Sequence, residues 1–171
     1  MSRRSAVVGG LAIVLAAAPA FAGPARITTM RLAAETTIAA APDAVWKSLT
    51  EGQSLVTWCP VWKSEGNKKV KLTKVGDVLD FTDEYGNGGR SVVTYLEAGK
   101  ELRVAHEPND GSYVCQAKIT LVPDGGATKV MYTEQYTDEQ DAAAADATAA
   151  KTEAGMQQTL AALRRSVQGP E

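Results

Sequence analysis

The chain has 171 residues, of which 44% are hydrophobic and 22% are charged, a composition typical of a globular protein with one core. Its 18 basic and 20 acidic residues give a formal net charge of −2, which excludes the strongly basic character of nucleic-acid-binding proteins. One histidine and two cysteines without a Cys-x2-Cys spacing form no metal-binding signature, so the sequence predicts no metal and no cofactor.

Residues 1–22 have the pattern of a secretory signal peptide. Arg3 and Arg4 form a positive n-region, residues 6–18 are apolar, and Ala20-Phe21-Ala22 has the A-x-A form of a cleavage site. The apolar run is shorter than the ~20 residues that a membrane-spanning helix needs. We therefore expect an exported protein, periplasmic or secreted, with no membrane-spanning segment after cleavage.

Cleavage after Ala22 leaves a linker over residues 23–28 and one folded domain over residues 29–168. An exported chain meets oxidising conditions, which permit a disulfide between Cys59 and Cys115 if their Cα atoms lie within roughly 7 Å. The alternative is a pair of buried thiols that pack as small hydrophobic side chains. The sequence leaves both alternatives open and contains no indication of the oligomeric state.

The domain begins with a strand and two short helices. Residues 29–38 alternate between apolar and polar side chains, which predicts a half-buried strand. Pro42 ends this strand, and the apolar positions of residues 44–50 share one face of a short helix. A second short helix is predicted for residues 54–58, and it ends at Cys59-Pro60.

Residues 61–136 contain repeated turn signals and no helical period, which predicts six further strands joined as a meander. Consecutive strands with short turns pair antiparallel and need no crossover connection. The predicted strands cover residues 61–72 with a bend, 78–82, 90–96, 101–106, 112–122 and 127–136.

A long helix is predicted for residues 141–167, with Asp138 or Asp141 as its N-cap. Apolar residues recur there at the three- and four-residue spacings of one helical face, and they are Ala149, Met156, Leu160, Leu163 and Val167. A helix with one apolar seam needs a surface that covers the seam. The sequence thus predicts an α+β fold, in which a curved antiparallel sheet of about seven strands wraps around this helix.

Two motifs at opposite ends of the domain resemble a known superfamily. The segment Ile38-Ala39-Ala40-Ala41-Pro42-Asp43-Ala44-Val45-Trp46, with Leu49, Leu55 and Trp58 after it, is similar to the opening signature of the SRPBCC or START-like proteins. Gly155-Met156-x3-Leu160-x2-Leu163 resembles that superfamily's glycine-aromatic-x3-Leu-x2-Leu helix, with methionine at the aromatic position. The superfamily includes the birch-pollen allergens, and the pattern here is closest to its branch of polyketide cyclases and activators of the chaperone ATPase.

This resemblance implies a helix-grip fold with a cavity between the sheet and the long helix. The cavity holds lipids and other small apolar molecules across the superfamily, which has no shared catalytic set, so the residues that face the cavity decide the function. Three hypotheses follow. The favoured one is an exported protein that binds a small apolar ligand without transforming it. The others are a cyclase- or hydratase-like enzyme that uses the same cavity, and a module that binds a protein partner.

His106 is the only histidine and the first candidate for acid or base chemistry. It alternates with Leu102 and Val104 along its predicted strand, which turns it toward the apolar side. An imidazole in such a cavity titrates near neutral pH and can transfer protons. The alternative is a half-exposed, hydrogen-bonded imidazole at the end of a strand.

Glu134 is the second candidate, because it shares one strand face with Val130, Tyr132 and Tyr136. If that face lines the cavity, desolvation raises the pKa of the carboxyl group and suits it to proton transfer. If the register is reversed, Glu134 is a charge exposed to solvent. The two faces of this strand are nearly equal in polarity, so the sequence leaves both registers open.

The other candidate ligand contacts are aromatic residues and the middle of the long helix. Trp58 and Trp62 flank a proline at an expected rim of the cavity, although aromatic side chains also pack in ordinary cores. The full set of expected ligand-binding residues is Trp58, Trp62, Phe81, Tyr95, His106, Tyr113, Tyr132, Met156 and Leu160.

Overall fold

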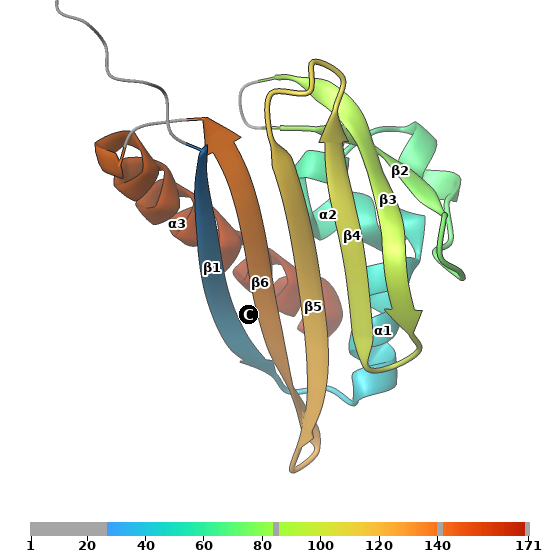
Figure 1. Cartoon of the computed structure of the whole chain (residues 1–171). Coiled ribbons are helices and arrows are strands. Elements are labelled where there is room, and N and C mark those ends of the chain that lie inside the picture. The colour runs from blue at the N-terminus through green and yellow to red at the C-terminus, as the bar shows by residue number, and fades with distance from the viewer. Residues whose placement is uncertain (1–26, 84–85, 140–141, 170–171) are drawn as a thin grey trace, which may run out of the picture.

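The computed structural model describes residues 27–83, 86–139 and 142–169 (Figure 1). Its strands are β1 (Ile27–Ile38), β2 (Val78–Thr82), β3 (Gly88–Glu97), β4 (Glu101–Pro108), β5 (Val114–Asp124) and β6 (Ala127–Glu139). They form one six-stranded sheet in the order β1-β6-β5-β4-β3-β2, and every neighbouring pair is antiparallel. The first and last strands therefore lie side by side at one edge.

Within the described residues, three α-helices cover one face of this curved sheet (Figure 1). Helices α1 (Pro42–Thr50) and α2 (Gly52–Trp58) follow β1, and α3 (Ala142–Gln168) lies across the sheet. The predicted α+β helix-grip architecture is thus confirmed. The expected N-cap of α3 and the predicted signal peptide lie outside the part of the chain whose side chains are described.

The predicted apolar seam of α3 packs into the core. Met156, Leu160 and Leu163 are buried, and Ala149 and Val167 are half-buried against the same cluster. Burial of a large apolar side chain contributes about 1.5–3 kcal/mol to the free energy of unfolding. These contacts hold the helix against the inner face of the sheet, and the core lies between the two.

The strand predicted for residues 61–72 was wrong, and the sheet has six strands rather than about seven. Two 3-10 turns, η1 (Pro60–Trp62) and η2 (Gly66–Lys69), occupy this segment. The reason is Asn67, whose side chain donates to the carbonyls of Trp62 and Asp80, at 2.9 Å each, and accepts from the Asp80 N–H at 2.8 Å. One buried amide therefore makes the contacts to β2 that a seventh strand would have made.

Helix α2 packs tightly on the loop that holds η2. The N–H of Gly52 donates to the carbonyl of Val70 at 2.7 Å. A Cβ atom at this position would lie 1.9 Å from the carbonyl oxygen of Asn67, closer than any non-bonded contact allows. Glycine at the start of α2 thus permits the close approach that places the end of this helix, with Trp58, over the sheet.

The structure shows which face of β6 looks into the domain, an alternative that the sequence left open. Val130 and Glu134 are buried, with 0% and 8% of their surfaces exposed, whereas Met131 is 40% exposed. The face with Tyr132 and Glu134 therefore looks toward the helices. The opposite face of β6 is turned to solvent.

Candidate functional site

One row of inward-facing side chains crosses four neighbouring strands. Ser91 on β3 is opposite His106 on β4, His106 is opposite Cys115 on β5, and Cys115 is opposite Tyr136 on β6. Directly opposed residues of an antiparallel sheet have Cβ atoms about 5 Å apart, so these side chains meet. Glu134 precedes Tyr136 by two residues on the same face, which adds a carboxyl group to the row.

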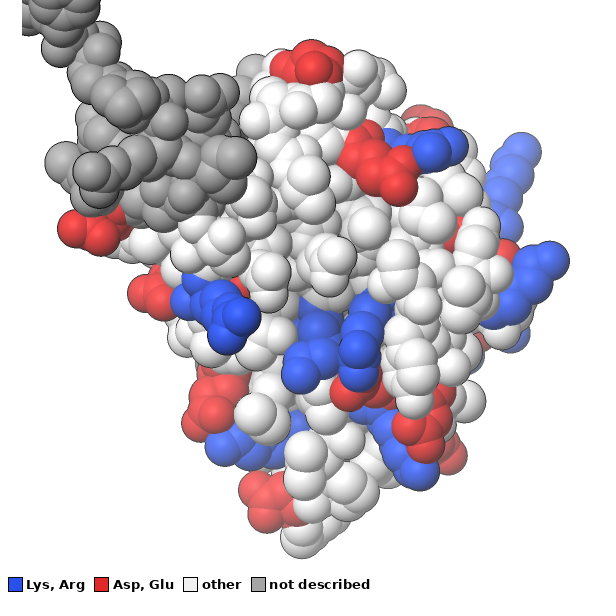
Figure 2. All heavy atoms as spheres, viewed as in Figure 1, with Lys and Arg blue, Asp and Glu red and all other residues white. Residues whose placement is uncertain are grey.

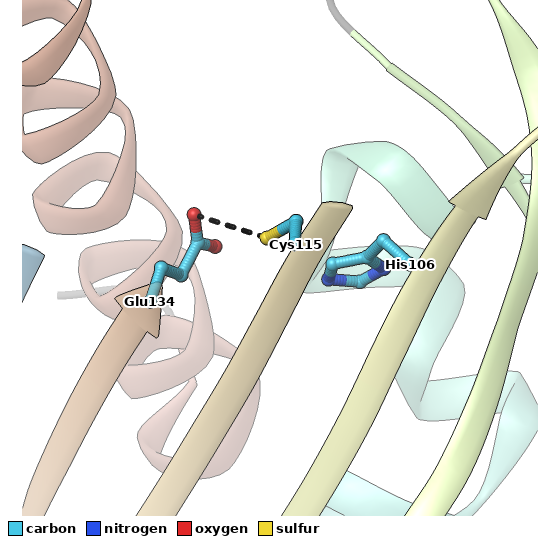
Figure 3. Close-up of side chains that lie close together, drawn as sticks. All are labelled: His106, Cys115 and Glu134. Carbon is cyan, nitrogen blue, oxygen red and sulfur yellow. Dashed lines mark hydrogen bonds between the residues drawn. The ribbon is translucent and has the colours of Figure 1, made fainter. Parts of the chain in front are cut away.

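The result is a buried cluster of three chemically different groups (Figure 3). One nitrogen of His106, the sulfur of Cys115 and one carboxyl oxygen of Glu134 lie within 4.8 Å of one another. All three residues are buried. The sheet thus concentrates the only histidine of the chain, a thiol and a carboxyl group in one place.

His106 is held as a neutral imidazole. Its Nδ1 lies 2.7 Å from the hydroxyl oxygen of Ser91, and that oxygen accepts a hydrogen bond from the indole N–H of Trp62 at 2.8 Å. Its ring stacks on Phe81 with the ring centroids 4.8 Å apart. Burial lowers the pKa of His106 from 6.5 to about 4, because water cannot solvate the protonated ring.

Glu134 is a buried carboxyl group that receives two hydroxyl donors. The phenol of Tyr132 donates to its Oε1, and the phenol of Tyr136 donates to the same carboxyl group. Desolvation raises the pKa of Glu134, and the two hydrogen bonds only partly oppose this rise. The group therefore keeps its proton to a higher pH than a carboxyl group in water.

The two cysteines are free, buried thiols, so the disulfide alternative does not hold in this structure. The sulfur of Cys115 lies 4.0 Å from Oε2 of Glu134, whereas Cys59 caps the C-terminus of α2. Burial raises the pKa of each thiol well above its ordinary value. Neither thiol is therefore an activated nucleophile.

A small cavity borders the cluster on the side of α2 and η1. Its volume is about 10 Å³, which holds about one water molecule. The wall is mainly apolar, and it is formed by Trp58, Cys59, Val61, Trp62, Leu102, Val104, His106, Ala117, Ile119 and Tyr132. At this position between α2, η1 and the sheet, the described side chains leave little free volume, and His106 and Tyr132 contribute the polar groups of the wall.

A larger hollow of about 460 Å³ lies on the other face of the sheet. Figure 2 shows this face, where acidic and basic side chains are interspersed. Arg31, Arg103 and Lys118 border the hollow together with glutamine and threonine side chains. This hollow is open to solvent and bordered by charged side chains, unlike the enclosed, mainly apolar cavity on the inner face.

Comparison with known proteins identifies the family. Residues 29–168 match the family described as polyketide cyclase / dehydrase and lipid transport. The chain belongs to this family. The predicted resemblance to the SRPBCC superfamily is thereby confirmed, and the fold is one that binds hydrophobic ligands. No curated protein matches the chain significantly in sequence.

Solved structures share the fold of this chain at low sequence identity. A protein of Mesorhizobium loti is 16% identical with a TM-score of 0.63, covering 83% of this chain and 99% of its own. The Aha1 dimer from Colwellia psychrerythraea is 18% identical with a TM-score of 0.59 and coverage of 82% and 97%. A truncated norcoclaurine synthase from Thalictrum flavum is 15% identical with a TM-score of 0.59 and coverage of 85% and 97%.

The structure gathers four of the predicted ligand contacts at the cavity of this family member, namely Trp58, Trp62, His106 and Tyr132. Five others lie elsewhere. The ring of Phe81 stacks on that of His106. Met156 and Leu160, both on α3, are buried in the core. The ring of Tyr113 lies against Tyr136, with the ring centroids 5.8 Å apart, beside the cluster.

Tyr95 does not reach the interior. A register shift between Val93 and Tyr95 interrupts the alternation of β3, and Tyr95 is 39% exposed, with the guanidinium of Arg103 4.8 Å from its ring centroid. A bulge of this kind leaves no reliable signal in a single sequence. The sequence reasoning also missed Ser91, whose role depends on its pairing with His106.

None of the helices within the described ranges combines the length and the apolar character that a membrane crossing requires.

Proposed function

We propose that this protein is exported and binds a small apolar molecule between α2, η1 and the sheet, without transforming it. The observation that supports this most is the chemistry of the cavity wall. Tryptophan and aliphatic side chains form most of it, and His106 and Tyr132 supply polar groups at one side. An apolar wall with a few convergent polar groups is typical of small-molecule sites.

Binding requires the wall to move, because a cavity of about 10 Å³ is far smaller than the several hundred Å³ of ordinary ligand pockets. The segment with Trp58, Val61 and Trp62 forms one side of the wall. The bond from Trp62 to Ser91 and the contacts of Asn67 hold this segment to the sheet. We expect a ligand to displace Trp62 and to take its place beside His106.

The export proposal is supported by the pattern of residues 1–22, with its two arginines, apolar run and A-x-A site. Expression of the full chain in a bacterium with a periplasm, followed by intact-mass analysis, tests it. A mature protein that begins at Gly23 in the periplasmic fraction is the expected result. A protein that keeps its first 22 residues and stays in the cytoplasm would refute export.

Ligand binding is tested by native mass spectrometry and lipid extraction on the protein purified under gentle conditions. We expect an apolar compound at about one per chain. A fluorescent fatty acid analogue then serves as a probe for the delipidated protein. Absence of both a co-purifying compound and any saturable binding of the probe would contradict the proposal.

A matched pair of variants locates the binding. Ala117 is buried and lines the cavity, whereas Ala33 is exposed on the outer face of the sheet. Ala117→Leu adds side-chain volume to the cavity and should weaken probe binding at least tenfold, while Ala33→Leu should not change it. Equal affinities of two folded variants would place the ligand elsewhere.

A second function, a cyclase- or hydratase-like reaction, is favoured by one observation. Glu134 has a raised pKa and contacts the phenol of Tyr132, which is a suitable arrangement for proton transfer to a buried substrate. Compounds extracted from the wild type and from Glu134→Gln distinguish the two functions. An enzyme predicts a different, unreacted compound in the variant, whereas a carrier predicts the same compound in both.

A further inference from the structure

We propose that His106, Cys115 and Glu134 form a binding site for one divalent transition-metal ion, with Zn²⁺ as the best chemical match. The three residues come from the adjacent strands β4, β5 and β6, and their donor atoms lie within 4.8 Å of one another (Figure 3). Imidazole nitrogen, thiolate sulfur and carboxylate oxygen are the three donor types that Zn²⁺ uses in proteins.

The geometry requires only a small contraction. Ligand atoms at roughly 2.0–2.3 Å from a tetrahedral ion are roughly 3.3–3.8 Å apart. Cys115 Sγ and Glu134 Oε2 are 4.0 Å apart, close to that separation. No separation among the three donor atoms is more than 4.8 Å, so none exceeds the required value by more than about 1 Å, a difference that side-chain rotation on fixed strands can supply.

The charges of the donors suit a buried ion. A divalent ion with one thiolate, one carboxylate and one neutral imidazole has no net charge, so the complex does not place an uncompensated charge in the interior. On binding, the S–H bond of Cys115 and any O–H bond of Glu134 are replaced by bonds to the ion. The displaced protons pass to solvent, up to two for each ion bound.

Neighbouring residues already orient the donors. Ser91 contacts Nδ1 of His106, which leaves Nε2 as the ring nitrogen for the ion, and Tyr132 and Tyr136 donate to the Glu134 carboxyl group. Outer contacts of this kind fix the orientation of metal ligands. Three protein ligands leave one position of a four-coordinate zinc ion for a water molecule.

Cobalt(II) substitutes for zinc and reports its ligands by absorption. The test uses the delipidated mature protein, treated with a chelator and kept reduced, and titrates it with CoCl₂ and then with ZnCl₂. We expect one Co²⁺ per chain, a thiolate-to-cobalt charge-transfer band in the near ultraviolet, and loss of that band when Zn²⁺ replaces cobalt. No saturable uptake of either metal by the folded protein would overturn the proposal.

Variants assign the ligands. The charge-transfer band should vanish in Cys115→Ser and persist in Cys59→Ser, which removes the other thiol of the chain. Zn²⁺ affinity should fall at least 100-fold in His106→Gln and in Glu134→Gln, with unchanged far-ultraviolet circular dichroism. A band that persists in Cys115→Ser, or unchanged affinity in both of the other variants, would refute the site.

The metal test is independent of the proposed apolar ligand. Absorption is recorded on delipidated protein without the fatty acid probe, so failure of ligand binding leaves the cobalt result unaffected. Conversely, a chain that binds the probe and takes up no metal would refute this inference and leave the proposed function standing. The number of protons released, measured with a pH indicator, gives a further check, because one or two protons per ion are expected.

Discussion

The hydroxyl oxygen of Ser91 lies 2.7 Å from Nδ1 of His106 and joins this imidazole to the indole of Trp62. The contact ties the polar end of the cavity to the segment that would move when a ligand enters. The hydrogen-bond partner of His106 is thus uncharged, while the Glu134 carboxyl group has an oxygen within 4.8 Å of one ring nitrogen. Burial of the ring nevertheless dominates and lowers the pKa of His106. Protonation of His106 therefore works against the folded state.

Stability should decrease on acidification because of His106. The unfolded chain binds a proton at this residue near pH 6.5, whereas the folded protein binds it only near pH 4. Between these values the unfolded state holds more protons, so the free energy of unfolding falls as the pH falls, by up to about 3 kcal/mol. Urea denaturation of the wild type and of His106→Gln from pH 7 to pH 4 measures this, and the variant should lose the effect. If the free energy of unfolding fell with pH equally in the wild type and in His106→Gln, the assignment of this effect to His106 would be wrong.

Glu134 should have the opposite pH dependence. Its pKa is raised in the folded protein, so the folded state keeps a proton that the unfolded state loses above pH 4.5. The free energy of unfolding that this group contributes therefore decreases as the pH rises from 4.5 through the folded-state pKa. Glu134→Gln cannot ionise, and it should become progressively more stable relative to the wild type over this range. A constant difference between the two unfolding free energies would count against a buried, proton-retaining carboxyl group.

Gly52→Ala should destabilise the protein by about 3 kcal/mol or more, because the added Cβ would lie 1.9 Å from a backbone oxygen of Asn67 and backbone atoms cannot rotate away. Relief of this contact requires α2 to move from the loop, and Trp58 moves with it. Thermal and urea denaturation measure the loss. A variant as stable as the wild type would mean that α2 does not pack as described.

Gly155→Ala is the matched control, and it should have the opposite effect. Gly155 lies within α3, and a Cβ atom there would have no neighbour within 4 Å. Alanine favours the helix by about 1 kcal/mol relative to glycine. The variant should therefore unfold at a higher urea concentration than the wild type, and a lower midpoint would indicate a packing contact at this position.

Most of the fold could be predicted from periodic patterns of apolar residues within short segments of the sequence. The seam of α3 was predictable because a helical period depends only on neighbouring residues, and Met156, Leu160 and Leu163 are buried as expected. The segment over residues 61–72 was not predictable in the same way. Its conformation depends on hydrogen bonds between Asn67 and Asp80, a residue 13 positions away, which no local period encodes.

The sequence by itself determined which residues alternate along each strand, and hence that His106 could face inward. The pairing of the strands determines which side chains lie next to His106. Cys115 and Glu134 join it only because β4, β5 and β6 align in one register, and a shift by one residue would turn each group to the opposite face. Register is set by packing and turns across the whole sheet, so the cluster is a property of the tertiary structure.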